Sequence, residues 1–446
     1  METHLADFIR GTVDGNEAEA ILRRCVHCGF CTATCPTYQL LGDELDSPRG
    51  RIYLIKEVLE GAPATASTRL HLDRCLTCRN CETTCPSGVE YGRLVDIGRR
   101  VVEERATEPR PLAERLERLA LREGLTRRWL FDPAMKIGRK VRPLLPAALA
   151  TKVPGTKHEK QKTLKPGRHA RKMLMLAGCV QPAMAPQIND ATVHVLDAIG
   201  IETIVARKVG CCGAIRHHLS DHDGALKDVK RNIDAWWPHL EAGAEGIVMN
   251  ASGCGAMLKE YGHLLRNDPD YAVKAERISA LTLDVSEVLA PFTDYLVAKL
   301  AAPSTRRVAW HPPCTLQHGQ QIRGPVEAML TAAGVDVKLC AESHLCCGSA
   351  GTYSVLQPEL ATALRDRKLT QLAALQPDAI VSANIGCITH LQSGTQMPVL
   401  HWIELIAGAL PRGGSRHGLF PGEAKQAPRV HKGPGPKPIP DPQRPL

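Results

Sequence analysis

Two short runs of the sequence each place four cysteines at one spacing, immediately before a proline. The first run holds Cys25, Cys28, Cys31 and Cys35, and the second holds Cys75, Cys78, Cys81 and Cys85. Both read C-x2-C-x2-C-x3-C-P, the bacterial run whose first three thiolates ligate one [4Fe–4S] cluster and whose fourth ligates the other. We therefore predict two clusters, one on Cys25, Cys28, Cys31 and Cys85 and one on Cys75, Cys78, Cys81 and Cys35.

Zinc and disulfide bonds explain these runs less completely. A zinc ion takes four thiolates, so one C-x2-C pair from each run would suffice and four further cysteines would remain unused. Disulfides are disfavoured because each run is too tight for regular bridging and the N-terminal residues show no signal-peptide pattern. Seventeen cysteines without such a pattern indicate a reducing compartment and metal ligation.

Eight further cysteines recur in two copies between residues 172 and 410. The first copy holds Cys179, Cys211, Cys212 and Cys254, and the second holds Cys314, Cys346, Cys347 and Cys387. The first two cysteines are 32 positions apart in both copies, and the last two are 42 and 40 positions apart. A buried cysteine often acts only as a small apolar residue, but that role does not explain the same spacing twice. The repeated spacing therefore predicts a metal site in this region.

Strand and helix patterns alternate around these eight cysteines, which predicts parallel sheets. The expected strands are 172–177, 203–209 and 246–251 in the first copy, and 307–311, 335–340 and 379–384 in the second. Every cysteine of the repeat falls at or after the carboxyl end of such a strand, where parallel sheets bind their ligands. We expect the four thiolates of each copy to converge on one site or on two nearby sites.

Helical patterns surround the two cysteine runs near the N-terminus. Residues 1–24 lead into the first run, Ser47-Pro48 opens a helix between the runs, and apolar residues recur at helical spacing from Leu94 to Val102. Residues 100–130 are expected to continue as a helix rich in Arg, Leu and Glu. Arg49 and Arg51 either offset the negative charge of a cluster or are solvated, and the sequence leaves both interpretations open.

Together these patterns predict an α+β chain. A mainly helical ferredoxin domain with two [4Fe–4S] runs is followed by a tandem-repeat α/β cysteine-rich domain with parallel sheets. The expected divisions are a ferredoxin-type domain at 1–130, a basic Pro-containing linker at 131–171, cysteine-rich repeats at 172–290 and 305–410, and a disordered basic Pro-rich tail at 411–446.

The net charge of +9 is concentrated in two segments: residues 151–172 carry +7 and residues 411–446 carry +5. Such segments suit an anionic membrane surface or a partner, and they serve equally well as solvated tethers. No interleaved aromatic pattern favours nucleic acid. No run approaches the ~18 uninterrupted apolar residues of a membrane helix. We expect a cytoplasmic protein whose basic segments allow peripheral contact with the inner face of the plasma membrane.

The residues around the cysteine runs carry a family resemblance. After Pro36 the chain reads Thr37-Tyr38-Gln39-Leu40-Leu41-Gly42-Asp43-Glu44 and then Ser47-Pro48-Arg49-Gly50-Arg51, and Leu72-Asp73-Arg74 precedes the second run. With these residues the chain resembles the iron–sulfur subunit of glycolate oxidase (glycolate dehydrogenase) over about residues 5–410. The two Cys-Cys-Gly copies match a wider cysteine-rich domain family, shared with heterodisulfide reductases, anaerobic glycerol-3-phosphate dehydrogenase and lactate-utilisation subunits.

The resemblance implies an electron-transfer subunit of a flavin-dependent complex. Glycolate would be oxidised to glyoxylate on partner FAD-containing glycolate oxidase subunits, and this chain would pass the electrons to a quinone or another respiratory chain acceptor. We assign no catalytic residue here, because no G-x-G-x-x-G follows a strand and opens a helix. Alternatives are an iron–sulfur subunit of a D-lactate or glycerol-3-phosphate dehydrogenase, a heterodisulfide-reductase-like enzyme, and an assembly subunit with structural zinc.

One departure from the wider family bears on these alternatives. The fullest form of its motif ends in C-x2-C, but Ala251 and Asn384 occupy the earlier position in the two copies. The five-cysteine cluster of the heterodisulfide enzymes therefore loses a ligand in both copies, which disfavours disulfide reduction. Four cysteines per copy still fit a further [4Fe–4S] cluster or zinc. For His311 and His318, which flank Cys314, we expect a structural or hydrogen-bonding role rather than ligation.

Overall fold

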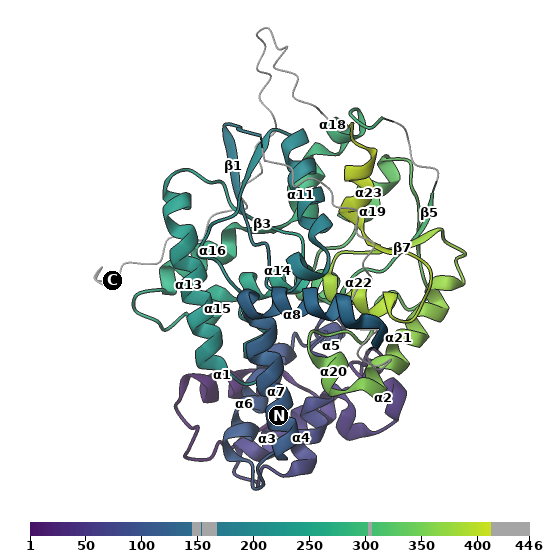
Figure 1. Ribbon diagram of the computed structural model, residues 1–446. Helices are drawn as coiled ribbons and strands as arrows, with labels where there is room; N and C mark the ends of the chain where they lie inside the picture. Colours follow the sequence, from purple (N-terminus) through teal and green to yellow (C-terminus); the bar gives the residue numbers. More distant parts are fainter. Residues whose placement is uncertain (145–152, 154–166, 302–305, 412–446) are drawn as a thin grey trace.

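The structure, a computed structural model, describes residues 1–144, 153, 167–301 and 306–411. A helical N-terminal part lies against two α/β units that follow one another along the chain (Figure 1). Most of the basic stretch at 151–172, and the tail at 411–446 apart from Pro411, fall outside the described residues. Within the described ranges, none of the helices combines the length and apolarity needed to cross a membrane.

The N-terminal part consists of helices packed around one apolar core. They are α1 (Val13–Arg24), α2 (Pro36–Leu41), α3 (Pro48–Leu59), α4 (Ala66–Asp73), α5 (Asn80–Thr84) and α6 (Tyr91–Arg105), with a 3-10 turn at Glu44–Asp46. Ser47 caps α3 by accepting a hydrogen bond from the Gly50 N–H, and Pro48 occupies the first helical position, where no intrahelical N–H is needed. The apolar faces of α1, α3 and α6 meet at Leu22 and Leu94, which are completely buried.

The helix expected over residues 100–130 is interrupted, so this prediction was wrong. α6 ends at Arg105, and α7 (Leu112–Thr126) begins only after Pro109 and Pro111. Proline lacks an N–H and clashes with the preceding helical turn, which explains the break. α8 (Arg128–Val141) then extends the helical structure into the segment expected as a linker, and it packs on α7 and on α10 of the first repeat.

Each α/β unit contains a four-stranded parallel sheet with the same strand order. The first sheet runs β2-β1-β3-β4 and the second β6-β5-β7-β8. Their strands are β1 (Arg171–Met175), β2 (Ile201–Ile204), β3 (Ile247–Met249), β4 (Thr282–Asp284), β5 (Arg307–Trp310), β6 (Asp336–Leu339), β7 (Ala379–Ser382) and β8 (Val399–His401). In the register, Leu174 of β1 pairs with Ile204 on one side and Ile247 on the other. The predicted parallel sheets are confirmed, and β4 and β8 were not predicted.

Helices cover both faces of the two sheets. Those of the first unit are α10 (Gln181–Met184), α11 (Pro186–Ala198), α12 (Ala214–His218), α13 (His222–Glu241), α14 (Ser252–Lys259), α15 (Tyr261–Leu264), α16 (Ala272–Leu281), α17 (Val285–Leu289) and α18 (Thr293–Val297). Those of the second unit are α19 (Pro325–Ala332), α20 (Tyr353–Leu356), α21 (Pro358–Ala373), α22 (Ile385–Gln392) and α23 (Trp402–Ala409), after a π-helical turn at Thr315–Gly319.

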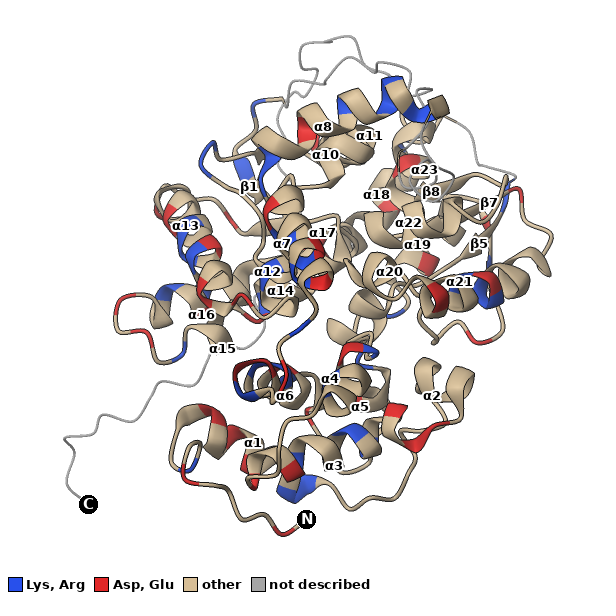
Figure 2. Cartoon of the chain, turned by 60° about the horizontal axis from the view of Figure 1, so that its bottom comes forward, with Lys and Arg blue, Asp and Glu red and all other residues tan. Residues whose placement is uncertain are grey.

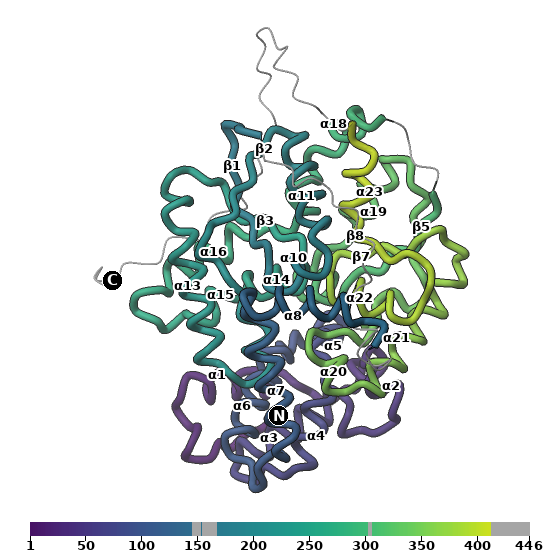
Figure 3. The backbone as a smooth tube through the Cα atoms, viewed as in Figure 1, coloured from purple at the N-terminus to yellow at the C-terminus, as the bar shows by residue number. Residues whose placement is uncertain are grey.

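The two units lie side by side and share one apolar core (Figure 3). α11 of the first unit packs against α23 of the second. The shared core joins Val195 and Val248 of the first unit to Trp310 and Trp402 of the second. Because both sheets are fixed in this way, the loops at their carboxyl ends reach the helical N-terminal part together.

A buried charge network holds the segment between the cysteine runs. The Asp46 carboxylate is completely buried and accepts hydrogen bonds from Arg51 at 3.1 Å and Arg74 at 2.9 Å, while His71 Nδ1 lies 3.1 Å away. Arg51 is also almost completely buried, and its Nε donates to the His71 carbonyl oxygen. The network therefore joins α3, α4 and the turn before α3.

Replacing Asp46 with Asn should lower the free energy of unfolding by about 3–5 kcal/mol, because it leaves buried guanidinium charge without its counter-charge. Urea unfolding of the anaerobically purified chain, followed by far-UV circular dichroism, measures this change. Asp7→Asn is the matched control, because the Asp7 side chain is exposed and pairs only with Arg10 at the surface. Equal stability of the two variants would contradict the assigned role of Asp46.

Candidate iron–sulfur centres

The four cysteines expected around the first cluster gather at one small cavity. Cys25, Cys28, Cys31 and Cys85 all line it, and Cys81 of the second predicted set lines it as well. Cys25 directly follows α1 and Cys85 directly follows α5, so the fold brings together residues that are 60 positions apart. Cys28 is exposed, which places this group at the surface of the molecule.

The cysteines expected around the second cluster form a deeper group. Cys75, Cys81 and Cys35 are buried and Cys78 is half-buried. Cys75 and Cys35 both act electrostatically on the thiols of Cys78 and Cys81, so the four sulfur atoms are close neighbours. The structure thus assembles both predicted sets, including the exchange of the fourth cysteine between runs. Ligation by these eight residues remains a prediction.

Both cysteine loops turn through the same left-handed backbone positions. The φ angles are 54° at His27 and 84° at Gly29 in the first loop, and 51° at Thr77 and 59° at Arg79 in the second. Non-glycine residues rarely adopt such angles, and these turns curl each loop around a common centre. The Thr77 N–H consequently points at the Cys75 sulfur at 3.4 Å. Hydrogen bonds to cluster sulfurs are among the contacts that set a cluster's reduction potential.

Arg51 is directed at the second group, which resolves the alternatives that the sequence left open for it. Its Nη1 lies 3.9 Å from the Cys35 sulfur, and its charge also acts on Cys75. Arg49 is half-exposed and forms an ion pair with Glu44 at 2.5 Å, and it lines the first cysteine cavity, where its charge acts on Cys31. A buried positive charge at this position offsets the negative charge of a thiolate-ligated cluster.

Burial and mutual repulsion oppose ionisation of several of these thiols. Burial raises the pKa of Cys31 to about 11, and burial together with neighbouring thiolates raises the pKa values of Cys78 and Cys81 well above the ordinary range. A metal cation reverses this preference because it binds thiolates and not thiols. The donor sets and their enclosure therefore fit iron–sulfur clusters.

The first cysteine-rich repeat brings its four cysteines together as expected. Cys179 Sγ lies 3.5 Å from Cys211 Sγ, Cys211 contacts Cys212, and Cys212 contacts Cys254. The amide of Asn232 donates to the Cys211 carbonyl oxygen at 2.7 Å and fixes this loop from α13. Three of the thiols are buried and Cys254 is half-buried.

The second repeat repeats this arrangement with Cys314, Cys346, Cys347 and Cys387. Contacts join Cys314 to Cys346, Cys346 to Cys347, and Cys347 to Cys387. Gly348 of the Cys-Cys-Gly motif has φ 87°, and a Cβ there would lie 2.5 Å from the Ala361 carbonyl oxygen. Glycine is therefore required where this loop passes over α21.

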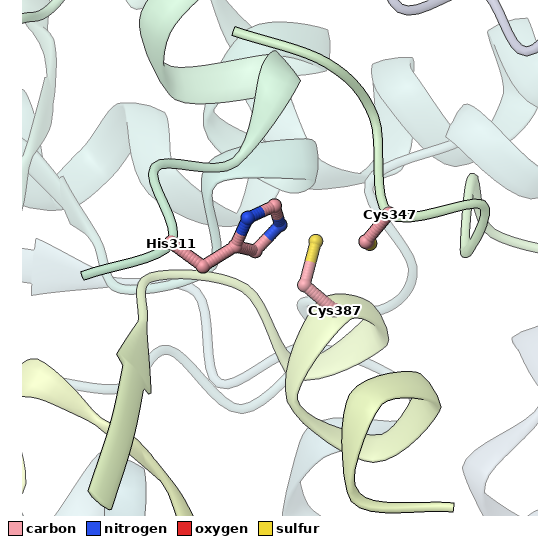
Figure 4. A group of neighbouring side chains, drawn as sticks. All are labelled: His311, Cys347 and Cys387. Carbon is pink, nitrogen blue, oxygen red and sulfur yellow. The ribbon is translucent and has the colours of Figure 1, made fainter. Parts of the chain in front are cut away.

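Two residues beside the thiols of the second site have surroundings that the sequence did not indicate. Neither ring nitrogen of His311 has a hydrogen-bond partner among the described residues, and the ring faces Cys347 and Cys387 (Figure 4). Asn384, where the fullest motif has a cysteine, donates toward the Cys387 sulfur at 3.8 Å. His318 has the expected hydrogen-bonding role, because its Nδ1 lies 3.0 Å from the Thr83 hydroxyl and its Nε2 2.9 Å from the His344 carbonyl oxygen.

The second cysteine run of the N-terminal part abuts the second repeat. Leu76 packs with Cys314 and Cys346 in one apolar cluster, and Cys78 packs against it. Tyr353 donates to the Arg74 carbonyl oxygen at 3.1 Å. The cysteine groups therefore follow one another from the surface at Cys28, through the second run, to the second repeat.

The sequence did not indicate the polar contacts between the N-terminal part and the first repeat. Asp96 on α6 pairs with His217 at 3.3 Å, and Arg79 pairs with Glu260 at 2.8 Å. These residues line a pocket that also reaches Cys78. The partners are 121 and 181 positions apart in the chain, and no local pattern could have paired them.

Family comparisons agree with this architecture. The family described as 4Fe-4S dicluster domain matches residues 21–89, and the family described as Cysteine-rich domain matches residues 173–259 and 308–392. The matched ranges contain the two cysteine runs and the two cysteine copies. The fold and its sites thus define an iron–sulfur electron-transfer protein of α+β architecture with tandem cysteine-rich repeats.

Comparisons with individual proteins identify the family within this class. The glycolate oxidase iron–sulfur subunit of Escherichia coli (strain K12) is 51% identical over 412 residues, which cover 92% of this chain and 100% of the relative. The probable glycolate oxidase iron–sulfur subunit of Bacillus subtilis (strain 168) is 30% identical over 85% of this chain and 90% of its own length. Lactate utilization protein A of Geobacillus thermodenitrificans is 25% identical over 53% of this chain. The chain belongs to the family of glycolate oxidase iron–sulfur subunits.

Replacing Cys28 with Ser should lower the iron content by about four atoms per chain, from about eight for two [4Fe–4S] clusters. Because Cys28 is exposed, the hydroxyl should leave the packing of the chain unchanged. Iron analysis and electron paramagnetic resonance of the anaerobically purified variant measure the loss. Cys340→Ala is the control, because Cys340 lies in the apolar core of the repeats. Iron loss in the control alone would exclude the assigned ligand set.

Proposed function

We propose that the chain is the electron-transfer subunit of a flavin-dependent glycolate dehydrogenase complex. Partner subunits that contain FAD oxidise glycolate to glyoxylate, and this chain carries the electrons to a quinone-type acceptor. The observation that supports the proposal most strongly is the unbroken succession of cysteine groups from the exposed Cys28 to the buried Cys314 and Cys346. The similarity to glycolate oxidase iron–sulfur subunits supports glycolate as the donor.

The surface around the first cysteine group suits the entry of electrons. Val26 and Phe30, which flank Cys28, are 68% and 61% exposed. Exposed apolar side chains beside a redox group give a partner protein a place to dock at short distance from it. We place the contact with the flavoprotein subunits at this face.

The residues around the cysteine groups adjust the reduction potentials along the path, and the clusters, when bound, supply one-electron transfer. The Arg51 guanidinium lies against Cys35 inside the protein and stabilises added negative charge at the second group. The Tyr91 hydroxyl donates toward the Cys75 sulfur at 3.6 Å and acts in the same direction. Arg99 donates to the carbonyl oxygens of Leu72 and Cys75 and holds the loop in place.

D-lactate is the competing donor, because lactate utilization proteins are among the relatives. Their similarity covers about half of this chain, whereas the glycolate oxidase subunits match nearly all of it. The acid itself would bind to the flavoprotein partners. The donor is therefore identified by measurements on the complex with glycolate, D-lactate and glycerol-3-phosphate.

Replacing Cys78 with Ser should abolish reduction of a quinone analogue by glycolate and leave reduction of the flavin by glycolate intact. The reason is that Cys78 belongs to the group between the surface and the second repeat. Anaerobic absorbance spectroscopy of the purified complex follows the flavin and the quinone analogue together. Cys340→Ala should keep both reactions. Quinone reduction at the wild-type rate in the Cys78 variant would refute electron transfer through the cysteine groups of this chain.

We also propose a cytoplasmic location with peripheral contact at an anionic membrane surface through α7 and α8. On this α7–α8 face, Trp129 is 71% exposed and Ile137 is 62% exposed, with Leu112, Leu116 and Leu119 also exposed. Two charged residues of α7 point inward instead, since Arg118 pairs with Asp73 and Glu123 with Arg216. Lys and Arg residues line α8 (Figure 2), and the sequence of residues 151–172 adds a charge of +7. Exposed aromatic and basic residues together favour an anionic lipid surface.

The double substitution Trp129→Ser and Ile137→Ser should weaken binding to vesicles that contain phosphatidylglycerol at least tenfold, because it removes the apolar anchor. Co-sedimentation of the purified complex with these vesicles measures the change, with phosphatidylcholine vesicles as the neutral comparison. Val273→Ser is the matched control, because Val273 is 82% exposed on α16. Unchanged vesicle binding together with loss of the flavoprotein subunits would assign the face to a protein partner.

A further inference from the structure

His311 is a completely buried imidazole without a hydrogen bond to its ring. It directly follows β5, where its backbone N–H donates to the Val381 carbonyl oxygen and its own carbonyl accepts from the Ser382 hydroxyl, both at 2.9 Å. These two bonds fix the backbone and leave the ring free to point elsewhere. Neither ring nitrogen has a hydrogen-bond partner within the described ranges. A buried polar group without a partner is costly, so the ring is a candidate to bind a ligand.

Two thiol groups lie close to the imidazole ring of His311. One nitrogen of His311, Cys347 Sγ and Cys387 Sγ all lie within 4.8 Å of one another. Figure 4 shows that the three side chains come from different elements and point toward a common centre. In the described part of the chain, the cysteines of the two N-terminal runs form no comparably compact group of three.

The spacing of the group fits a single metal ion. The first repeat also has a close pair of thiols, with Cys179 Sγ and Cys211 Sγ 3.5 Å apart, so the nitrogen donor is what sets the second repeat apart. Donors around one tetrahedral zinc ion lie about 3.3–3.8 Å apart, given Zn–S and Zn–N bonds of about 2.3 and 2.0 Å. The cysteines of a [4Fe–4S] cluster bind four different irons and are spread more widely. The group at His311 is near the mononuclear arrangement. Cys346 contacts Cys347 but lies outside the compact group of three, so it becomes the fourth donor only when the Cys-Cys-Gly loop adjusts on metal binding.

The first repeat lacks this nitrogen donor. His311 stands three positions before Cys314, and Leu176 stands three positions before Cys179. Leu176 is 2% exposed and belongs to the apolar core of the first repeat. The two copies, although alike in their cysteines and strand order, therefore offer different donor sets: four sulfurs in the first, and sulfur with nitrogen in the second.

We propose that His311, Cys347, Cys387 and Cys346 bind one zinc ion in the second repeat. The inference goes beyond the proposed function, because it depends on neither the electron donor nor the acceptor. Zinc has no redox chemistry of its own, so the ion acts as a structural tie. It joins the end of β5, the Cys-Cys-Gly loop and α22 beside the loop that carries Cys78. The first repeat, which lacks the nitrogen donor, offers four sulfurs that fit zinc or a further iron–sulfur cluster.

Metal analysis and zinc K-edge X-ray absorption of the full chain, purified anaerobically with its partners, test the proposal. We expect about one zinc per chain with one nitrogen at about 2.0 Å and three sulfurs at about 2.3 Å. His311→Leu should reduce the zinc content several-fold. His311→Cys should keep the zinc and change its shell to sulfur alone. His401→Asn, which removes another completely buried imidazole of this repeat but keeps a capping side chain for α23, should change neither.

Three outcomes would overturn the zinc site. They are a wild-type zinc shell of sulfur alone, zinc retained in full by His311→Leu, and no zinc combined with iron clearly above about eight atoms per chain. The wild-type absorption spectrum decides the question even where His311→Leu does not fold. The experiment measures metal content and coordination, not activity. A result that refutes the zinc site therefore does not refute glycolate-dependent electron transfer, and a result that refutes electron transfer does not refute the zinc site.

Discussion

Buried thiolates repel one another unless a cation lies among them, and most of the seventeen cysteines of this chain are buried or half-buried in groups of four. This constraint explains why the loops that carry cysteines are held by several local contacts. Left-handed residues, a required glycine and hydrogen bonds from the flanking helices hold each loop. Metal binding and folding are then expected to be coupled, because each group brings together distant segments that repel without a metal.

The placement of the N-terminal part against the carboxyl ends of both sheets gives the groups their order. Parallel sheets present their ligand sites at this end, so a redox domain docked there lies close to the cysteines of the repeats. Arg79 with Glu260, Asp96 with His217 and Thr83 with His318 join the two parts. The two repeats differ beside their cysteines at His311 against Leu176 and at Asn384 against Ala251, and the first of these differences underlies the zinc site proposed for the second repeat.

The sequence was most informative where spacing is dictated by chemistry. The cysteine runs and the repeated Cys-Cys-Gly copies predicted the α+β class, the parallel sheets and the grouping of the cysteines. β4 and β8 escaped prediction because strands of three residues carry too short a pattern. The break between α6 and α7 was missed although Pro109 and Pro111 indicate it. The unpartnered ring of His311 and the Asp96–His217 pair depend on contacts between distant segments, which the order of residues does not contain.

The most direct test of the central claim is rapid-freeze electron paramagnetic resonance on the wild-type complex, mixed anaerobically with glycolate and then with a quinone analogue. If electrons pass through the clusters of this chain, we expect the signals of the reduced clusters to appear at least as fast as the complex turns over. These signals should decay when the quinone analogue is added. Clusters that stay oxidised while the flavin is reduced and the quinone analogue is still consumed would contradict electron transfer through these clusters. Electrons would then bypass the groups at Cys25 and Cys75.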